Sequence, residues 1–289
     1  MPPTQKVRRL IGGIIARYQE KLGIEIYSYV ILSNHLHLLI KSPKSNTDEF
    51  MENVNREITR RINWKFRREG SLWGRRYSEQ EVITEEDLVE VFLYINTNMC
   101  RHGLVDTPSK WGGLHSAEQV VSERRRRFSF YLYSKKDLLG RPVKETHYLK
   151  LSVLPQFREL SQKRRKKKVR LLLDTRVKDI REGREKNGEG FLGVRKLLEQ
   201  SVGDVPRNVS KSARPSCYTK CKVALKKFQR ERRRLREIYA ECSIKFRLGD
   251  LSVRFPEHTY KPPLHRAPRR KAFTHILANN FEDTLKIFA

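Results

Sequence analysis

The stretch Tyr29-Val-Ile-Leu-Ser-Asn-His-Leu-His-Leu-Leu-Ile40 decides the fold class of this chain. It joins two β-rich runs, residues 25–32 and 36–41, through the turn-prone pair Ser33-Asn34, and this pattern predicts an antiparallel hairpin. Successive side chains of a strand point to opposite faces. His35 and His37 are therefore expected on one face of the second strand, with Leu36 and Leu38 on the other.

Amphipathic helices flank this hairpin. Apolar residues recur at steps of three and four over residues 6–22 and again from 48 to about 66. A short strand around residues 81–83 follows, and then a third helix that Thr84 can cap and that runs to about Met99. The order helix, strand, strand, helix, strand, helix is that of a split β-α-β plait without its first strand. We therefore expect an α+β, ferredoxin-like domain with an antiparallel sheet, whose first strand is either absent or supplied by another part of the chain.

Charge divides the chain into two regions. The 289 residues carry a formal net charge of +29, but residues 1–120 are close to neutral at +2 and residues 121–289 carry +27. A polyanion such as nucleic acid is the partner best able to neutralise this excess. We expect a catalytic domain over residues 1–120 and a basic, mostly helical, nucleic-acid-binding region over residues 121–289.

Several protein classes are excluded by composition. The four cysteines are too few and too unevenly spaced for a disulfide framework, and their spacing does not indicate a zinc knuckle. No apolar run approaches the roughly 18 residues of a membrane helix, and the N-terminus does not resemble a signal peptide. The expected location is the cytoplasm, in association with the nucleoid and without membrane contact.

Two pairs of residues could carry chemistry. His35 and His37, side by side on one strand face, are half of a divalent-metal site, although a His-x-His pair alone is more often two polar residues on a half-exposed strand. Tyr94 and Asn98 lie four residues apart on the third predicted helix and so share a face. A phenol can attack phosphorus and an amide oxygen can bind a hard cation, although this spacing alone is more often packing plus a surface amide.

Taken together, these segments resemble the REP-associated tyrosine transposases and their insertion-sequence relatives. The resemblance rests on residues 29–40, on Leu72-Trp-Gly-Arg-Arg-Tyr77, on Tyr94-Ile-Asn-Thr-Asn-Met-Cys-Arg-His-Gly-Leu-Val105 and on Ser109-Lys-Trp111. It covers about residues 5–116, and Gly249-Asp-Leu-Ser-Val-Arg-Phe-Pro256 is similar to the C-terminal region of longer members.

This resemblance implies an HUH site that cuts and rejoins single-stranded DNA at hairpin-forming sites. His35 and His37 would bind Mg²⁺ or Mn²⁺, Asn98 would take the position of the third ligand, and Tyr94 would be the nucleophile that forms a 5′-phosphotyrosine. The metal would polarise the scissile phosphate. The expected partner is single-stranded DNA with hairpins. A homodimer is compatible with the sequence, which leaves open whether an active site would be shared between subunits.

Basic residues are the candidates for DNA binding, although each could equally be a solvated surface charge. One group is expected near the site: Arg56, Arg60, Arg61, Arg75 and Arg76. The other is the densest basic run of the C-terminal region: Lys163, Arg164, Arg165, Lys166, Lys167 and Lys168.

Two other functions remain open at this stage. The chain could be a catalytically impaired or domesticated relative that binds DNA or RNA hairpins without cutting, and the state of the sheet around His35 and His37 would distinguish this protein from the enzyme. A general RNA-binding basic protein would fit the charge of residues 121–289 but leaves the histidine, tyrosine and asparagine set unexplained.

Overall fold

The computed structural model describes residues 3–74, 76–199, 215–257, 259–263 and 285–288. Its first half alternates helices and strands in the following order: α1 (Gln5–Leu22), β1 (Glu25–Ile31), β2 (Leu36–Lys41), α2 (Thr47–Phe66), β3 (Glu79–Val82), α3 (Glu85–Asn96), α4 (Asn98–Arg101), η1 (Pro108–Lys110) and α5 (Ala117–Ser122). The second half holds a long hairpin and the longest helices: β4 (Arg126–Lys136), β5 (Pro142–Leu149), η2 (Pro155–Phe157), α6 (Gln162–Lys186), α7 (Val194–Glu199), β6 (Cys217–Tyr218), α8 (Lys222–Arg247) and β7 (Leu285–Phe288).

The predicted elements of the first region are confirmed, except that the third helix ends at Asn96 and not at about Met99. Gly23 ends α1 in a left-handed conformation with φ +71°, as expected for a helix-terminating glycine. The β1–β2 hairpin forms with a loop closed by a hydrogen bond from the Leu32 amide to the His35 carbonyl at 2.9 Å. Thr84 caps α3 by accepting a hydrogen bond from the Asp87 amide.

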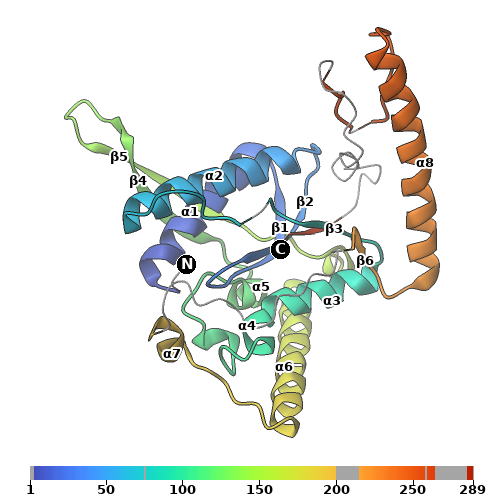
Figure 1. Ribbon diagram of the computed structural model, residues 1–289. Helices are drawn as coiled ribbons and strands as arrows, with labels where there is room; N and C mark the ends of the chain where they lie inside the picture. Colours follow the sequence, from blue (N-terminus) through green and yellow to red (C-terminus); the bar gives the residue numbers. More distant parts are fainter. Residues whose placement is uncertain (1–2, 75, 200–214, 258, 264–284, 289) are drawn as a thin grey trace.

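A five-stranded sheet in the order β1-β2-β7-β3-β6 forms the centre of the molecule (Figure 1). Its neighbours are antiparallel except for the short parallel pair β3–β6. Strand β7, near the C-terminus, lies between β2 and β3, with Ile287 opposite Leu39 on one side and Gln80 on the other. Strand β7 thus joins the β1–β2 hairpin to β3 in one continuous sheet, although it comes from the far end of the sequence.

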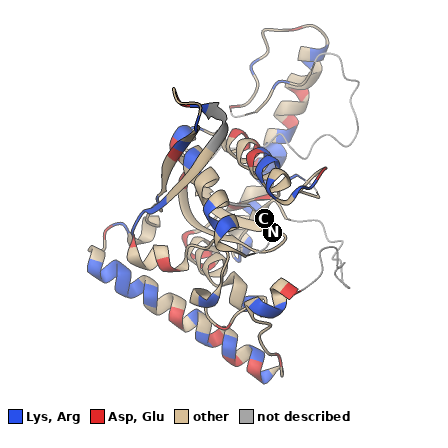
Figure 2. Ribbon diagram, turned by 90° about the vertical axis from the view of Figure 1, so that its left-hand side faces the viewer, with Lys and Arg blue, Asp and Glu red and all other residues tan. Residues whose placement is uncertain are grey.

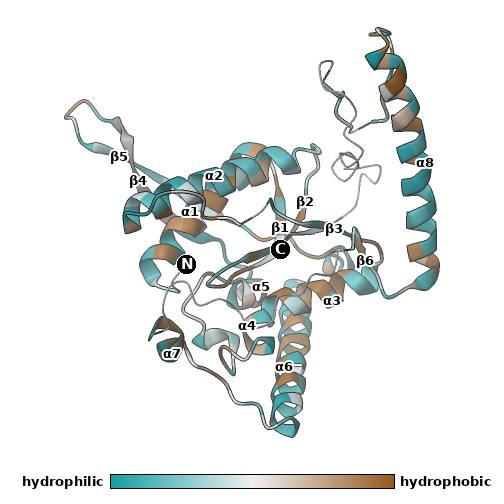
Figure 3. Cartoon of the chain, viewed as in Figure 1, coloured by the Kyte–Doolittle hydropathy of each residue, from teal (hydrophilic) through white to brown (hydrophobic). Residues whose placement is uncertain are grey.

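Helices cover both faces of this sheet. The face that carries Leu36, Leu38 and Ile40 packs against α1 and α2. The opposite face, which carries Leu39, packs against α3, and α6 joins the same apolar cluster through its contacts with α3. Figure 3 shows the apolar residues of α1, α2 and α3 turned toward these layers, whereas the middle of α8 is hydrophilic. The chain is therefore a mixed α and β protein with mainly antiparallel sheets, as predicted.

Residues 126–149 form the two-stranded β4–β5 ribbon, an element that the sequence analysis did not predict within the mostly helical region 121–289. This ribbon extends beyond the helices that it crosses (Figure 1). Phe128 and Phe130 alternate with polar residues and pack against α1, where a Cβ on Gly12 would lie 2.4 Å from the Phe128 ring. Two glycines in α1, Gly12 and Gly13, thus allow the ribbon to approach the helix closely.

The boundary at residue 120 stays a prediction. Segments on both sides of it share the same layers, because β6 and β7 join the central sheet, the ribbon packs on α1, and α6 packs against α3 and α5. All four cysteines lie in described residues and have free thiols, as expected. None of the described helices combines the length and the apolar composition that a bilayer span requires.

Candidate active site

The two histidines stand at the start of β2, as the strand pattern predicted. His37 is buried, with 6% of its surface exposed, and His35 is half-buried. Their ring centres lie 4.8 Å apart in an edge-to-face arrangement. His35 Nδ1 lies 2.7 Å from the side-chain oxygen of Asn34, and this contact orients the ring from within the hairpin loop.

Tyr94 projects from α3 toward the same face of the sheet. Its ring centre lies 5.7 Å from that of His37, and the Arg101 guanidinium lies 5.8 Å from the Tyr94 ring centre on another side. Tyr94 therefore lies beside His37 within one chain, as predicted, whereas the expected place of Asn98 at the same site stays a prediction. A phenol, an imidazole pair and a guanidinium meet at this face, which is a set of groups suited to an anionic substrate.

A buried hydrogen-bond chain fixes α3 against β1 next to this face. The Ser116 hydroxyl donates to the Asn96 side chain at 2.7 Å and accepts a hydrogen bond from the Tyr29 amide at 2.9 Å. Asn96 and Ser116 are completely buried, so their hydrogen bonds are shielded from water. These residues, which the sequence analysis did not identify, position the C-terminal turn of α3 and with it Tyr94.

Asn98 lies beyond a break that the sequence did not predict. Helix α3 ends at Asn96, and α4 begins at Asn98, so Tyr94 and Asn98 are on separate helices. Thr97 lies between them, and its hydroxyl donates to the Leu93 carbonyl at 2.8 Å, a back-bonding contact that bends helices. Asn98 is completely buried, and neither atom of its amide has a hydrogen-bond partner among the described residues.

A third imidazole, His102, was missed by the sequence analysis. Its ring centre lies 6.2 Å from that of His35, at the end of α4. Partial desolvation, together with the positive charges of Arg101 and Arg184, lowers the pKa of His102 below its ordinary value. His102 lies in the quoted stretch 94–105, but no local periodicity in the sequence indicates that its side chain is near the β1–β2 hairpin.

The two histidines supply only part of the ligand set that a divalent cation needs. Among the described residues, no group of three or more His, Cys, Asp and Glu side chains is placed to hold a metal. A cation bound by His35 and His37 would therefore need oxygen ligands as well. The buried Asn98 amide, which has no hydrogen-bond partner among the described residues, is the type of group that supplies one. These residues fit a cation that also takes oxygen from water and from a substrate phosphate.

The three candidate arginines of α2 were expected near the histidine pair, but they lie on the other side of the sheet. Helix α2 covers the Leu36 and Leu38 face of the sheet, whereas Tyr94 and His37 meet on the other face. Arg56, Arg60 and Arg61 are therefore not beside the histidine pair, because the sheet separates the two layers. Arg56 and Arg60 are exposed, and whether they bind DNA stays a prediction.

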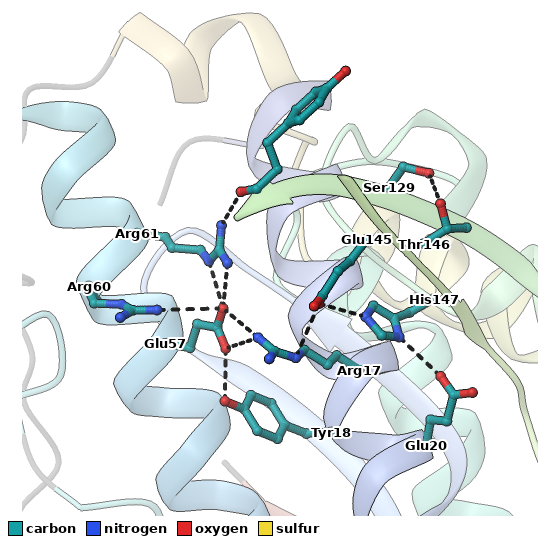
Figure 4. Close-up of polar contacts among 11 residues, drawn as sticks. Arg17, Tyr18, Glu20, Glu57, Arg60, Arg61, Ser129, Glu145, Thr146 and His147 are labelled. Carbon is teal, nitrogen blue, oxygen red and sulfur yellow. Dashed lines mark hydrogen bonds and ion pairs between the residues drawn. The ribbon is translucent and has the colours of Figure 1, made fainter. Parts of the chain in front are cut away.

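Arg61 has a structural partner (Figure 4). It pairs with the buried carboxylate of Glu57 at 2.7 Å, donates to the Tyr131 carbonyl at 3.2 Å, and retains 14% exposure. Glu57 also accepts a hydrogen bond from the Tyr18 hydroxyl at 2.9 Å and pairs with Arg17. Burial alone would raise the pKa of the Glu57 carboxyl, but the hydrogen bonds from Arg61 and Tyr18 and the charges of Arg61 and Arg17 outweigh it and leave that pKa below its ordinary value.

The remaining basic candidates differ in exposure. Arg76 is exposed, and Arg75 lies outside the described residues. The basic residues of α6 are conspicuous in Figure 2. Arg165 donates two hydrogen bonds to the Glu123 carboxylate, the longer of them 2.8 Å, and Lys166 is half-buried. The other members of this run are exposed to solvent: Lys163, Arg164, Lys167 and Lys168.

Comparison with known proteins identifies the segment that carries this site. Residues 3–98 match the family described as "Transposase IS200 like". The resemblance inferred from the sequence motifs is thereby confirmed. This segment contains His35, His37, Tyr94 and Asn98 and ends before His102 and the β4–β5 ribbon.

A relative supports the same assignment. A Haemophilus influenzae protein assigned as a REP-associated tyrosine transposase is 28% identical over 104 residues, which are 32% of this chain. The chain spans 58% of the length of that relative. No solved structure matches the chain.

Proposed function

We propose that this protein is a transposase that cuts and rejoins single-stranded DNA, with Tyr94 as the nucleophile. The observation that carries the proposal is the 5.7 Å separation of the His37 and Tyr94 rings within the IS200-like segment. Phosphoryl chemistry requires both a nucleophile and groups that stabilise charge, and the phenol and the imidazole pair supply both types of group.

The proposed fold of this domain is a ferredoxin-like plait of the HUH type. In a split β-α-β plait, a strand lies between the second strand of the hairpin and the strand that precedes the last helix. In this chain β7 lies in that position, antiparallel to both neighbours. A complete sheet around His37 favours the enzyme over a relative that only binds hairpins.

The proposed reaction begins with attack of the Tyr94 phenol oxygen on the scissile phosphorus. The bond between phosphorus and the 3′ oxygen breaks, the phenolic proton passes to water, and the leaving 3′ oxygen takes a proton from water. The products are a 5′-phosphotyrosine and a free 3′-OH. The phosphodiester bond energy is retained in the phosphotyrosine, so a 3′-OH can later displace Tyr94 without ATP. Arg101, whose guanidinium lies near the Tyr94 ring, is placed to hold the phosphate.

His35, His37 and Asn98 are the residues that would hold Mg²⁺ or Mn²⁺. When bound, such a cation would polarise the scissile phosphate and offset the negative charge that develops on it. The proximity of His37 to Tyr94 in a single chain supports an active site assembled within one subunit, so that a homodimer would not be needed to complete it.

A second candidate function is hairpin binding without cleavage. The break at Thr97 favours it, because Tyr94 and Asn98 are on separate helices and Asn98 is completely buried. If this break persists when DNA binds, the third ligand would be out of place and cleavage would fail.

A covalent-adduct assay separates the two functions. The full chain is incubated with Mn²⁺ and a labelled library of hairpin-bearing single strands, and adducts are resolved on a denaturing gel. The enzyme hypothesis expects an adduct that EDTA abolishes, that Tyr94→Phe abolishes and that the control Tyr218→Phe retains. DNA binding without any adduct in the library would favour the hairpin-binding protein.

A further inference from the structure

The β4–β5 ribbon presents a second surface, outside the segment that matches the transposase family. Side chains alternate between two faces of the ribbon. The inner face carries Phe128 and Phe130 against α1. The outer face is defined by three cross-strand pairs: Arg127 with Tyr148, Ser129 with Thr146, and Tyr131 with Lys144.

This outer face combines positive charge, aromatic rings and hydroxyl groups. Tyr131 and Tyr148 are 49% and 37% exposed, and the Arg125 guanidinium lies 4.4 Å from the Tyr148 ring centre. The hydroxyls of Ser129 and Thr146 lie 2.8 Å apart, between the cross-strand pair that contains Tyr148 and the pair that contains Tyr131.

Acidic residues of the ribbon lie elsewhere. Glu145 is on the inner face, where it pairs with Arg17 at 3.5 Å and contacts His147 at 3.2 Å. Asp137 is at the turn, paired with Arg141. The charged side chains that the three cross-strand pairs and Arg125 present on the outer face are therefore all cationic.

The ribbon is held in a defined orientation by the α1–α2 layer (Figure 4). The Arg61 guanidinium, paired with buried Glu57, lies 4.6 Å from the Phe130 ring centre and donates to the Tyr131 carbonyl. His147 Nδ1 lies 3.1 Å from the Glu20 carboxylate of α1. These contacts fix the backbone from which Tyr131 projects, so that binding to its outer face would require little reorganisation.

We propose that the outer face of the β4–β5 ribbon binds single-stranded DNA, with phosphates at Arg125, Arg127 and Lys144 and an unpaired base stacked on Tyr131. Among the described residues of the ribbon, the outer face sets three cations together and no carboxylate, which matches a polyanion. Exposed aromatic rings between cations are the features by which proteins bind single strands. A duplex offers phosphates but no free base face for Tyr131. The nature of the nucleic acid rests on the proposed function, but the binding itself does not depend on cleavage.

The test measures binding in a protein that cannot cleave. Full-length Tyr94→Phe protein in EDTA is titrated with fluorescent oligo-dT, which forms no hairpin, at several salt concentrations. Arg125→Gln/Arg127→Gln/Lys144→Gln should lower the slope of log affinity against log salt by about 2, since each phosphate contact on a single strand contributes about 0.7. Tyr131→Ala should weaken binding roughly tenfold with an unchanged slope.

A matched control removes two arginines and one lysine from the α1–α2 layer instead of the ribbon. Arg9→Gln/Lys65→Gln/Arg68→Gln alters three exposed residues of α1 and the α2 end and should change the slope by much less than 1. Circular dichroism and thermal unfolding establish that every variant is folded. Bromodeoxyuridine-substituted strands should photocrosslink to the peptide that contains Tyr131.

Three outcomes would overturn the proposal. These are equal slopes for the ribbon and control variants, a crosslink that avoids the ribbon, or equal losses on duplex and single-stranded DNA, which would make the surface a duplex site or a site for another acidic partner. The proposed transposase activity is judged separately by the adduct. Loss of the adduct with intact ribbon binding would count against the catalytic proposal alone.

Discussion

His37 on β2 and Tyr94 on α3 lie with their ring centres 5.7 Å apart, although α2 and β3 separate them in the sequence. The sheet brings them together because His37 points to the face that α3 covers. Hydrogen bonds from Ser116 to Asn96 and from Tyr29 to Ser116 then hold the end of α3 on β1.

The His35→Ala variant should separate binding from chemistry. It removes one of the two imidazoles, so cleavage should fall at least about 100-fold, while hairpin affinity changes by less than about threefold because backbone contacts are spread over many basic residues. Cleavage is followed by adduct yield, and binding by fluorescence anisotropy in EDTA. Tyr218→Phe, which lies outside both the site and the ribbon, is the control and should change neither quantity. A loss of affinity by orders of magnitude in His35→Ala would indicate a structural or docking role for this residue.

The exposed start of α6 should supply salt-dependent affinity. Residues 1–120 alone would lack β7, so the test uses the full chain with Lys163, Arg164, Lys167 and Lys168 each changed to Gln. The slope of log affinity against log salt should fall by up to about 3, given a contribution of about 0.7 per single-strand phosphate. Four exposed cations of the α1–α2 layer changed in the same way provide the control: Arg9, Lys21, Lys65 and Arg68. Equal slopes for the two variants would mean that α6 does not touch DNA.

Strand β7 should be necessary for stability of the central sheet. Proline at Ile287 removes a backbone N–H from a strand that pairs on both sides, and the carbonyl left unpaired costs about 1–3 kcal/mol. We expect a lower melting temperature and faster amide exchange in β2 and β3. Ile287→Val, which keeps the N–H, should behave like the wild type. Unchanged exchange in Ile287→Pro would show that β7 does not stabilise the sheet in solution.

Glu57 should make stability depend on acid pH. Its folded pKa lies below the ordinary value of 4.5. A carboxyl with a depressed folded pKa contributes stability that is complete above its unfolded pKa and is lost as the pH falls through the folded pKa. Glu57→Gln should therefore lower the free energy of unfolding by roughly 3 kcal/mol at pH 7, since it leaves half-buried Arg61 without its charged partner, and should flatten the decline below pH 4.5.

Glu52→Gln is the matched control for this effect. Glu52 pairs with Arg56 on the exposed side of α2, and exposed pairs of this spacing contribute about 0.5 kcal/mol or less. Chemical denaturation of both variants between pH 3 and pH 7 measures the difference. Equal losses in the two variants would contradict the structural role assigned to Glu57.

Local periodicity predicted much of this fold. The apolar spacing of residues 6–22, the alternation around His35 and His37, and the cap at Thr84 each depend on neighbours in sequence, and these elements formed as predicted. The same reasoning placed both histidines on one strand face, whereas the position of Tyr94 beside them was implied by the resemblance to the transposases.

Other features depend on distant contacts. Ribbon β4–β5 was missed because the run of arginines before Phe128 obscured its alternation, and β7 is a four-residue strand whose position is set by the edges of β2 and β3. The separation of the α2 arginines from the site follows from which sheet face α2 covers. His102 lies near His35 after the break at Thr97, where the Thr97 hydroxyl donates to the Leu93 carbonyl, and no sequence period marks this break.

The central claim is that Tyr94 becomes covalently joined to DNA. Its most direct test is mass spectrometry of the adduct formed by the full chain with hairpin-bearing single strands and Mn²⁺, after digestion by trypsin and nuclease. The proposed function predicts a nucleotide attached to the peptide that contains Tyr94 and a released strand that ends in a 3′-OH. Attachment to another residue, or an undiminished adduct in Tyr94→Phe, would contradict it.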